Sequence, residues 1–193
     1  VDEAIRQLNN YPLFIEEIKE IVEYLIDHLY IKTFSIGSGL PDALEQYGCY
    51  TREDIFTLFG RQTAERRMQG SVAGAFNFEE YNTEAFFVTL NKSDADFSPS
   101  TQYDDYVISE YKFHWQSQNN DSHAGRGKRF VEQKKNKKKF LLFVREQKKD
   151  GFGNTCPFHC FGLIDYIRSY GDFPMNIEWK LQEPIMPQYL KSV

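Results

Sequence analysis

Residues 175–182, MNIEWKLQ, alternate strictly between apolar and polar side chains. In an extended strand, successive side chains point to opposite faces. One face therefore carries the apolar set Met175, Ile177, Trp179 and Leu181. This period of two is typical of a strand with one buried face. The stretch predicts that the C-terminal part of the chain is built on a β-sheet.

Five stretches upstream also fit strands, because each is apolar or alternating and is bounded by polar turns. They are residues 72–78, 85–90, 111–118, 139–145 and 158–166. In 111–118 the alternation places Tyr111, Phe113, Trp115 and Ser117 on one face. A short helix is expected at 127–133. Five or six strands with little helix favour a closed or nearly closed small barrel.

The first 60 residues have a helical pattern instead. Three helices are expected, from Pro12, between Pro41 and Gly48, and from Thr51 to Gly60. The first has apolar residues three and four positions apart, namely Ile15, Ile18, Val22, Leu25 and Leu29. The third begins with a capping-box pair, Thr51 and Asp54.

The sequence therefore predicts an α+β chain with two parts, a helical module at 1–65 and a PUA/SRA-like β-barrel at 66–193. Residues 1–60 carry 11 acidic and four basic residues, a charge of −7. Such a segment is not expected to contact a nucleic-acid backbone. It is interpreted as a coupling module that docks on a neighbouring domain, or as a helical hairpin that caps the second part.

Length and composition exclude several classes of protein. The chain has 193 residues, 41% of them hydrophobic, and a net charge of −5, which are globular values. No apolar run approaches the roughly 20 residues of a membrane helix, and the start of the chain has no signal-peptide pattern. The missing initiator Met indicates a piece of a longer protein. Three cysteines fit a reducing cytoplasm better than a disulfide framework.

Charge is distributed unevenly. Residues 126–149 contain 11 basic and two acidic residues, a local charge of +9. Such clustering is typical of a polyanion-binding face, although a solvated Lys-rich loop has the same composition. The candidate contacts to a DNA backbone are Arg126, Lys128, Arg129, Lys134, Lys135, Lys137, Lys138 and Lys139.

Rings, carboxylates, amides and hydroxyls gather in residues 98–130. A pocket for a flipped base needs aromatic rings to stack on the base and an acid or amide for its Watson–Crick edge. Cytosine offers an N4 amino group, which an Asp accepts. The candidate pocket residues are Tyr103, Asp105, Tyr106, Trp115, Gln116 and Ser117. The alternative is that Phe113 and Trp115 are core residues and that Gln116 and Gln118 form an exposed face.

Two other chemistries have weaker patterns. Cys156, His159 and Cys160 offer three zinc-type ligands, but zinc sites normally use two separated pairs. Glu110 and Lys112 form an E-x-K triplet that, with Asp94, resembles a metal-dependent nuclease site. No metal site is assigned from either pattern.

Several motifs in order resemble a bacterial C-terminal domain family found behind a phospholipase-D-type nuclease and a superfamily 2 helicase. The motifs are SP at 98–99, YDDY at 103–106, FHWQSQ at 113–118, GKRF at 127–130, LLFVRE at 141–146, FG at 161–162 and PMNIEW at 174–179. The match is similar to the C-terminal part of SauUSI-type type IV restriction enzymes, which depend on modified DNA. The resemblance implies an SRA-like, PUA-related barrel that recognises 5-methylcytosine or 5-hydroxymethylcytosine, with Tyr103, Asp105, Tyr106 and Trp115 as pocket candidates.

The resemblance also implies that ATP hydrolysis and DNA cleavage, with any Mg²⁺, belong to upstream helicase and nuclease domains of the same polypeptide. We therefore expect a binding domain without its own cofactor, whose partner is methylated double-stranded DNA and not a membrane. The alternatives are a nuclease domain that uses Asp94, Glu110 and Lys112, and an adaptor between helicase and nuclease.

Overall fold

The computed structural model of the chain describes residues 6–28, 32–63, 65, 74–92 and 103–192. The chain divides into two compact units, Val1–Thr33 and Phe34–Val193. The first unit contains helix α2 (Pro12–His28), which begins at Pro12 as predicted. On α2 the predicted apolar residues Ile18 and Val22 are exposed. None of the helices in the described ranges has the length and apolar character that crossing a membrane requires.

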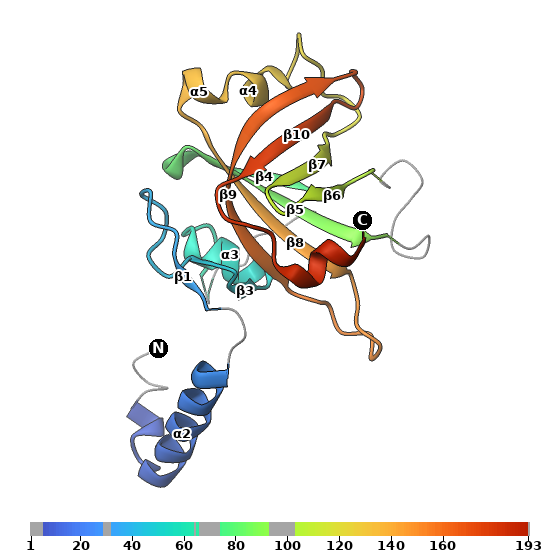
Figure 1. The fold of residues 1–193 in the computed structure, drawn as a ribbon. Helices are drawn as coiled ribbons and strands as arrows, with labels where there is room; N and C mark the ends of the chain where they lie inside the picture. Colours follow the sequence, from blue (N-terminus) through green and yellow to red (C-terminus); the bar gives the residue numbers. More distant parts are fainter. Residues whose placement is uncertain (1–5, 29–31, 64, 66–73, 93–102, 193) are drawn as a thin grey trace. The chain divides into compact units, whose positions relative to one another are not determined.

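The second unit is a large, mostly antiparallel sheet with short helices (Figure 1). Its strands pair in the order β4 (Ala75–Phe78), β5 (Thr83–Asn91), β8 (Lys139–Gln147), β9 (Phe158–Tyr170), β10 (Asn176–Leu181), β7 (Lys112–Gln116) and β6 (Tyr106–Ser109). The short strand β3 (Cys49–Tyr50) pairs with β9, and β1 (Phe34–Ser35) pairs with β2 (Glu45–Gln46). The unit also contains the 3₁₀ turns η1 (Glu79–Tyr81) and η3 (Pro187–Ser192).

The α+β class is confirmed, but the closed barrel is not. A barrel needs a ladder between its first and last strands. In the described part of the chain β4 pairs only with β5 and β6 only with β7, so the sheet has two open edges. The strands β5 and β8 are parallel, from Thr83 opposite Lys139 to Asn91 opposite Gln147. A parallel pair needs a crossover connection, and here β6, β7 and two helices lie between β5 and β8 in the chain.

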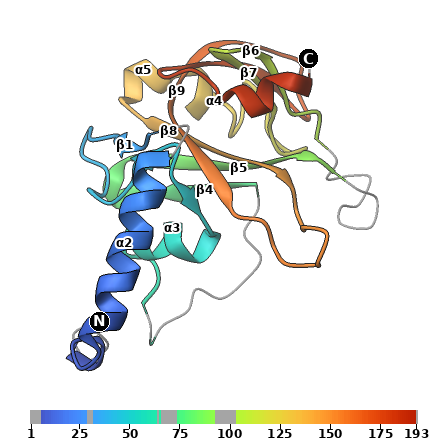
Figure 2. The same ribbon diagram turned by 60° about the horizontal axis from the view of Figure 1, so that its bottom comes forward.

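Both faces of the β5–β8 ladder are buried, which accounts for the high aromatic content. The ring of Phe87 lies in a core with helix α3 (Arg52–Leu58), whose buried side chains include Ile55 and Phe56. The neighbouring ring of Phe86 lies in a second core on the other face of the ladder, where it stacks on Trp115 with centroids 4.1 Å apart. Adjacent strand residues point to opposite faces, so α3 and the short helix α4 (Lys128–Val131) cover opposite sides of the ladder (Figures 1 and 2).

The segment 34–60 therefore contributes to the core of the sheet-containing unit, and the division of the chain falls near residue 33 and not near residue 65. The predicted third helix is confirmed as α3, with the Thr51–Asp54 capping box and Gly60 at φ +68°. The predicted second helix, between Pro41 and Gly48, is wrong. The backbone there pairs with β9, because the N–H of Tyr47 donates to the carbonyl of Cys160 and the N–H of Cys160 donates to that of Gly48.

Candidate nucleic-acid interface

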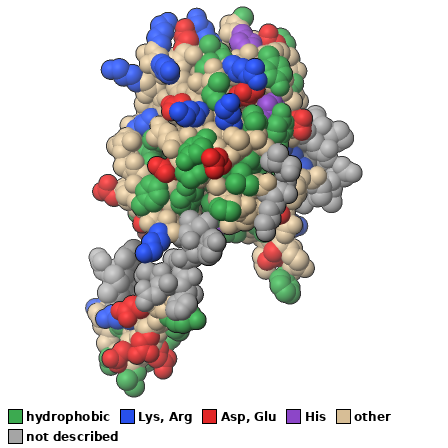
Figure 3. All heavy atoms as spheres, in the orientation of Figure 1, with side chains coloured by type: hydrophobic (Ala, Val, Ile, Leu, Met, Phe, Trp, Pro, Cys, Tyr) green, Lys and Arg blue, Asp and Glu red, His purple; other side chains and the backbone are tan. Residues whose placement is uncertain are grey.

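The first half of the basic segment forms two short helices, and the second half continues into strand β8. Helix α4 is followed by α5 (Gln133–Asn136) and by Lys137, which ends α5 in the left-handed conformation. Phe130 and Gln133 are buried and fix this pair to the sheet. The amide of Gln133 donates to the carbonyl of Ile164 at 2.9 Å and accepts from the N–H of Tyr166 at 2.6 Å. With these two side chains turned inward, the lysines point outward, and Figure 3 shows Lys and Arg side chains gathered over α4 and α5.

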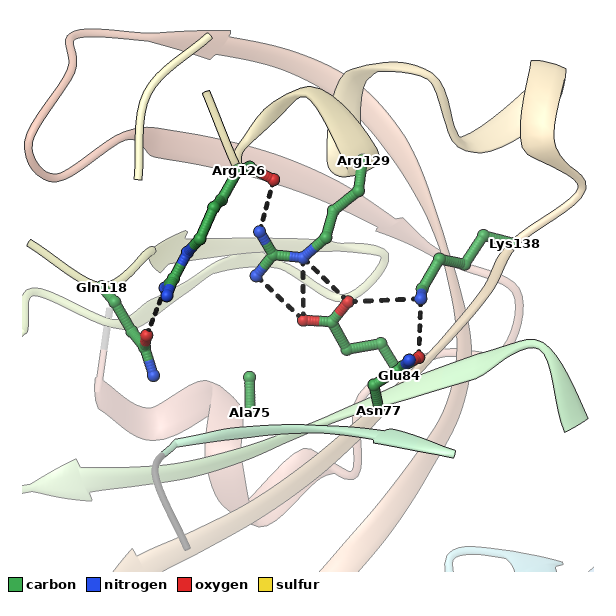
Figure 4. A pocket seen from close by; sticks show the side chains of 7 residues that line it. All are labelled: Ala75, Asn77, Glu84, Gln118, Arg126, Arg129 and Lys138. Carbon is green, nitrogen blue, oxygen red and sulfur yellow. Dashed lines mark hydrogen bonds and ion pairs between the residues drawn. The ribbon is translucent and has the colours of Figure 1, made fainter. Parts of the chain in front are cut away.

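A pocket of about 390 Å³, with mostly polar and charged residues around it, lies beside α4, over β4 and β5 (Figure 4). Seven residues line it, namely Ala75, Asn77, Glu84, Gln118, Arg126, Arg129 and Lys138. The buried carboxylate of Glu84 is its centre. The Nε and Nη2 atoms of Arg129 lie 3.0 and 3.1 Å from the two Glu84 oxygens, and Nζ of Lys138 lies 3.6 Å away. Lys138 also donates to Asn77 at 2.7 Å.

A second buried carboxylate, Asp121, pairs with both arginines. Its Oδ1 atom lies 3.1 Å from Nε of Arg126 and 3.3 Å from Nη1 of Arg129. Its Oδ2 atom is buried and has no hydrogen-bond partner among the described residues. Burial lowers the pKa of Arg129, but Glu84 and Asp121 outweigh this effect and raise it. Three cations on two carboxylates leave the cluster with one surplus positive charge.

The predicted backbone contacts therefore fall into two groups. Arg129 and Lys138 are held by Glu84, Arg126 is held by Asp121, and Lys139 donates to the carbonyl of Ser38 at 3.0 Å. The side chains of Lys128, Lys134, Lys135 and Lys137 are exposed. Lys128 and Lys135 both approach Glu132, at 3.9 and 3.1 Å. The second group is named here the α4–α5 lysines; Arg126, in the first group, is also exposed, with 54% of its side chain open to solvent.

The predicted base pocket is only partly assembled. Asp105 lies in a buried ion pair with Lys92, at 2.8 Å, and its other oxygen accepts the backbone N–H of Gln116 at 3.0 Å. Lys92 also donates to the carbonyl of Tyr103. Burial raises the pKa of Asp105, and Lys92 opposes that rise. The carboxylate is thus a fixed support that joins Tyr103 to Gln116, and sequence reasoning missed Lys92 because it follows a different strand.

Tyr106 is the exposed ring of this cluster. It stacks on His114 with centroids 4.4 Å apart and an interplanar angle of 13°. Tyr106 is 43% exposed, whereas His114 is 2% exposed beneath it. Nδ1 of His114 is 2.7 Å from the carbonyl of Asp104, and no partner of its buried Nε2 lies among the described residues. Gln116 accepts from the N–H of Asp104 at 2.8 Å and donates to Asn176 at 3.0 Å.

Two of the predicted pocket residues, Trp115 and Ser117, are buried on the core side of β7 and its extension. Trp115 is buried, with Phe86 stacked on one side and Phe130 edge-on at 5.3 Å. Ser117 is buried, and its hydroxyl accepts the N–H of Met175 at 3.0 Å. Both lie on the inward face that the alternation of 111–118 indicates. The structure therefore brings together Tyr103, Asp105, Tyr106 and Gln116, which we name the Tyr106 cluster, and separates them from Trp115 and Ser117.

The zinc-type pattern and the nuclease-type pattern do not form an assembled site among the described residues. Glu110 and Lys112 are exposed at the β6–β7 turn, and Asp94 lies outside the described ranges. His159 bonds to the hydroxyl of Tyr189 at 2.6 Å, and burial lowers its pKa. Burial raises the pKa of the Cys160 thiol to about 12. Across the described ranges, no group of three or more His, Cys, Asp or Glu side chains is arranged to hold a metal ion.

Comparisons with known proteins give one family and a distant structural similarity. The family model "Domain of unknown function (DUF3427)" matches residues 44–192. No curated protein matches the sequence. The solved structure "The 5-Hydroxymethylcytosine-Specific Restriction Enzyme AbaSI" is 18% identical over 89% of this chain, with a TM-score of 0.44. The chain spans 53% of that enzyme's length. At this TM-score no property of the enzyme is transferred to the chain.

Proposed function

The chain belongs to the DUF3427 family, and we propose that it is a DNA-binding module that recognises 5-methylcytosine or 5-hydroxymethylcytosine. In this proposal it is the target-recognition part of a modification-dependent restriction enzyme. Cleavage of DNA and hydrolysis of ATP would be the work of other domains of the same polypeptide.

The observation that carries the proposal is the basic surface of α4 and α5 beside a pocket with surplus positive charge. A folded core holds this surface in place through Phe130 and Gln133. The α4–α5 lysines project from it, although the whole chain has a net charge of −5. Such local concentration is the electrostatic footprint of a protein that binds a polyanion. Phosphate contacts of this kind supply affinity and register but no reading of bases.

Recognition of the base is assigned to the Tyr106 cluster. An exposed ring that rests on a buried imidazole is held rigidly and presents a surface on which an extruded base can stack. Stacking on an aromatic side chain contributes about 1–3 kcal/mol per base. The amide of Gln116 lies in the same cluster, and amides read base edges. Asp105, whose oxygens are already engaged by Lys92 and Gln116, holds the cluster together in this scheme.

The motif resemblance to the SauUSI-type C-terminal domain supports the choice of ligand. The FHWQSQ motif supplies both β7 and the histidine beneath Tyr106. The YDDY motif supplies Tyr106 and the buried Asp105. From the same motif resemblance we infer that the sheet is related to SRA-like, PUA-type domains. Flipping of the modified base into the cluster is part of this proposal.

Binding measurements on matched duplexes test the proposed function. Fluorescence anisotropy would compare one duplex that carries cytosine, 5-methylcytosine or 5-hydroxymethylcytosine at a single position, at 50 and 200 mM salt. We expect tighter binding to a modified duplex by roughly tenfold or more, since a methyl group in an apolar niche contributes about 1–3 kcal/mol. Equal affinity for all three duplexes would reject recognition of the modification. Absence of salt dependence would reject the basic surface as the binding face.

A further inference from the structure

The hairpin between β8 and β9 ends in an aromatic side chain that contacts almost nothing. Phe152 is 94% exposed, more than any other large hydrophobic side chain in the described part of the protein. The hairpin projects from the sheet in Figure 1, and in Figure 3 the same projection ends in a hydrophobic side chain. A ring in this position contributes nothing to the core and is open to contact by a partner outside the chain.

Hydrogen bonds within the turn hold the backbone that carries this ring. The carboxylate of Asp150 accepts the backbone N–H groups of Phe152 and Asn154, at 2.9 and 2.8 Å, and the side-chain amide of Asn154 at 3.0 Å. The N–H of Asp150 donates to the carbonyl of Asn154, and Gly153 supplies the φ of +87° that the turn requires. Below the tip, Lys149 pairs with Thr155. The backbone of Phe152 is therefore held before any partner arrives.

The base of the hairpin adjoins the Tyr106 cluster. Gln147, the last residue of β8, pairs with Asn91, the last residue of β5. The residue that follows β5 is Lys92, which pairs with Asp105 and donates to the carbonyl of Tyr103. Through Asp105, Lys92 thus ties the strand that carries Tyr106 to the end of the β5–β8 ladder from which the hairpin of Phe152 leaves.

Charge and distance favour nucleic acid as the partner. Residues 148–155 carry Lys148 and Lys149 against Asp150, a charge of +1. The α4–α5 lysines precede β8 and the hairpin follows it, so the nine residues of β8 separate them. At about 3.3 Å per residue this strand is roughly 30 Å long. That length corresponds to about nine base pairs at 3.4 Å each. A duplex of about nine base pairs is therefore long enough to reach from the α4–α5 lysines to the hairpin.

We propose that Phe152 is an apolar wedge that enters the base stack of DNA when the target base leaves it. Proteins that unstack DNA insert Phe, Leu, Ile, Met or Pro between base steps. The ring then covers the bases exposed by extrusion, while the lysines below the tip approach the phosphates. The inference rests on the proposed function and adds the second surface that base extrusion needs.

The test uses the full chain with Phe152→Ala and the matched control Phe173→Ala, which removes another exposed ring, 64% exposed, from a different loop. The probes are two duplexes with one 5-hydroxymethylcytosine and 2-aminopurine beside it. In the first duplex the target is paired with guanine, and in the second it faces an abasic site, where it is already unpaired. Anisotropy gives the affinity, and 2-aminopurine fluorescence reports unstacking. Circular dichroism checks that both variants are folded.

We expect Phe152→Ala to weaken binding to the paired duplex about tenfold, the effect of losing roughly one stacked ring. The fluorescence rise should disappear with it. The loss should be smaller on the unpaired target, where extrusion costs less. Phe173→Ala should match the wild type on both duplexes. If the wild type prefers modified DNA and Phe152→Ala binds and unstacks equally well, the wedge is wrong and the tip is a contact for protein. If the wild type shows no preference for modified DNA, the proposed function fails and the wedge fails with it.

Discussion

The carboxylate of Asp105 and the ammonium of Lys92 are 2.8 Å apart, and their side chains are 5% and 9% exposed. Lys92 follows β5, whereas Asp105 precedes β6 at one edge of the sheet. The pair joins the parallel ladder to the edge strand that carries Tyr106. The carboxylate of Asp105 thus lies inside the candidate recognition site, but it is paired with Lys92 and is not exposed to a ligand.

Removing Asp105 should therefore affect stability first. Asp105→Ala leaves the ammonium of Lys92 buried without its partner, which typically costs about 3–5 kcal/mol of unfolding free energy. A double variant, Lys92→Met with Asp105→Asn, removes both charges and should recover much of that loss. Urea denaturation of the three proteins measures the effect. An Asp105→Ala protein as stable as the wild type, but without preference for modified DNA, would mean that Asp105 reads the base directly.

Tyr106→Ala should abolish the preference for modified DNA and leave the salt-dependent binding to unmodified duplex nearly unchanged. The reason is that a ring on the surface stacks on the base but contributes little to the core. Tyr111→Ala is the matched control, because Tyr111 is 41% exposed, close to the 43% of Tyr106, and lies in the neighbouring turn. Anisotropy with modified and unmodified duplexes separates the two variants. Retained preference in Tyr106→Ala would move the reading of the base to the pocket at Glu84.

The α4–α5 lysines should control affinity for any DNA sequence. Replacing Lys134 and Lys137 with Ala should weaken binding to modified and unmodified duplexes equally. If each contacts one phosphate, the slope of log K against log salt should fall by about two, at roughly 0.9 per contact. Lys19→Ala, an exposed lysine of α2, is the control. An unchanged slope in the double variant would place the DNA away from α5. Lys138 and Lys139 are poorer choices, because Glu84 and the carbonyl of Ser38 hold them.

His159 should make the protein sensitive to mild acid. Burial lowers the pKa of His159, so the folded protein takes up its proton at a lower pH than the unfolded chain, whose histidine titrates near about 6.5. Below that pH the unfolded state binds more protons, so the unfolding free energy falls as the pH falls toward the folded pKa. His159→Gln should reduce this slope between pH 7.5 and 5.5 in urea denaturation. Equal slopes in the two proteins would assign the acid sensitivity to other groups.

The local elements of the fold were predictable from sequence because short-range chemistry decides them. Alternation in 175–182 and 111–118 predicted the strands and their inward faces, and Ile177, Trp179 and Phe113 are buried as those patterns require. The capping pair Thr51 and Asp54 and the glycine at position 60 predicted α3. In each case the decisive interaction joins residues a few positions apart, so the order of the residues is sufficient.

Long-range pairing explains what the sequence could not determine. The segment 41–48 has helix-compatible ends, but hydrogen bonds to β9, more than a hundred residues later, hold it extended. Trp115 lies in a stretch that is rich in polar groups, yet Phe86 and Phe130 enclose it. Alternation predicted that Trp115 points inward. The stretch itself could not show that Phe86 and Phe130 occupy the space around its ring.

The sequence by itself determined the composition of the candidate interface, namely a basic segment and a segment of rings, carboxylates and amides. Only the tertiary structure decided which of these groups face outward. The parallel pairing of β5 with β8 brings Glu84 to Arg129 and Lys138, and it brings Lys92 to the end of the ladder where Asp105 lies. Because buried charges are stable only when paired, these contacts hold some predicted site residues inside the protein. The α4–α5 lysines and Tyr106 remain on the surface, where Lys128 and Lys135 pair with Glu132, the residue between the two helices.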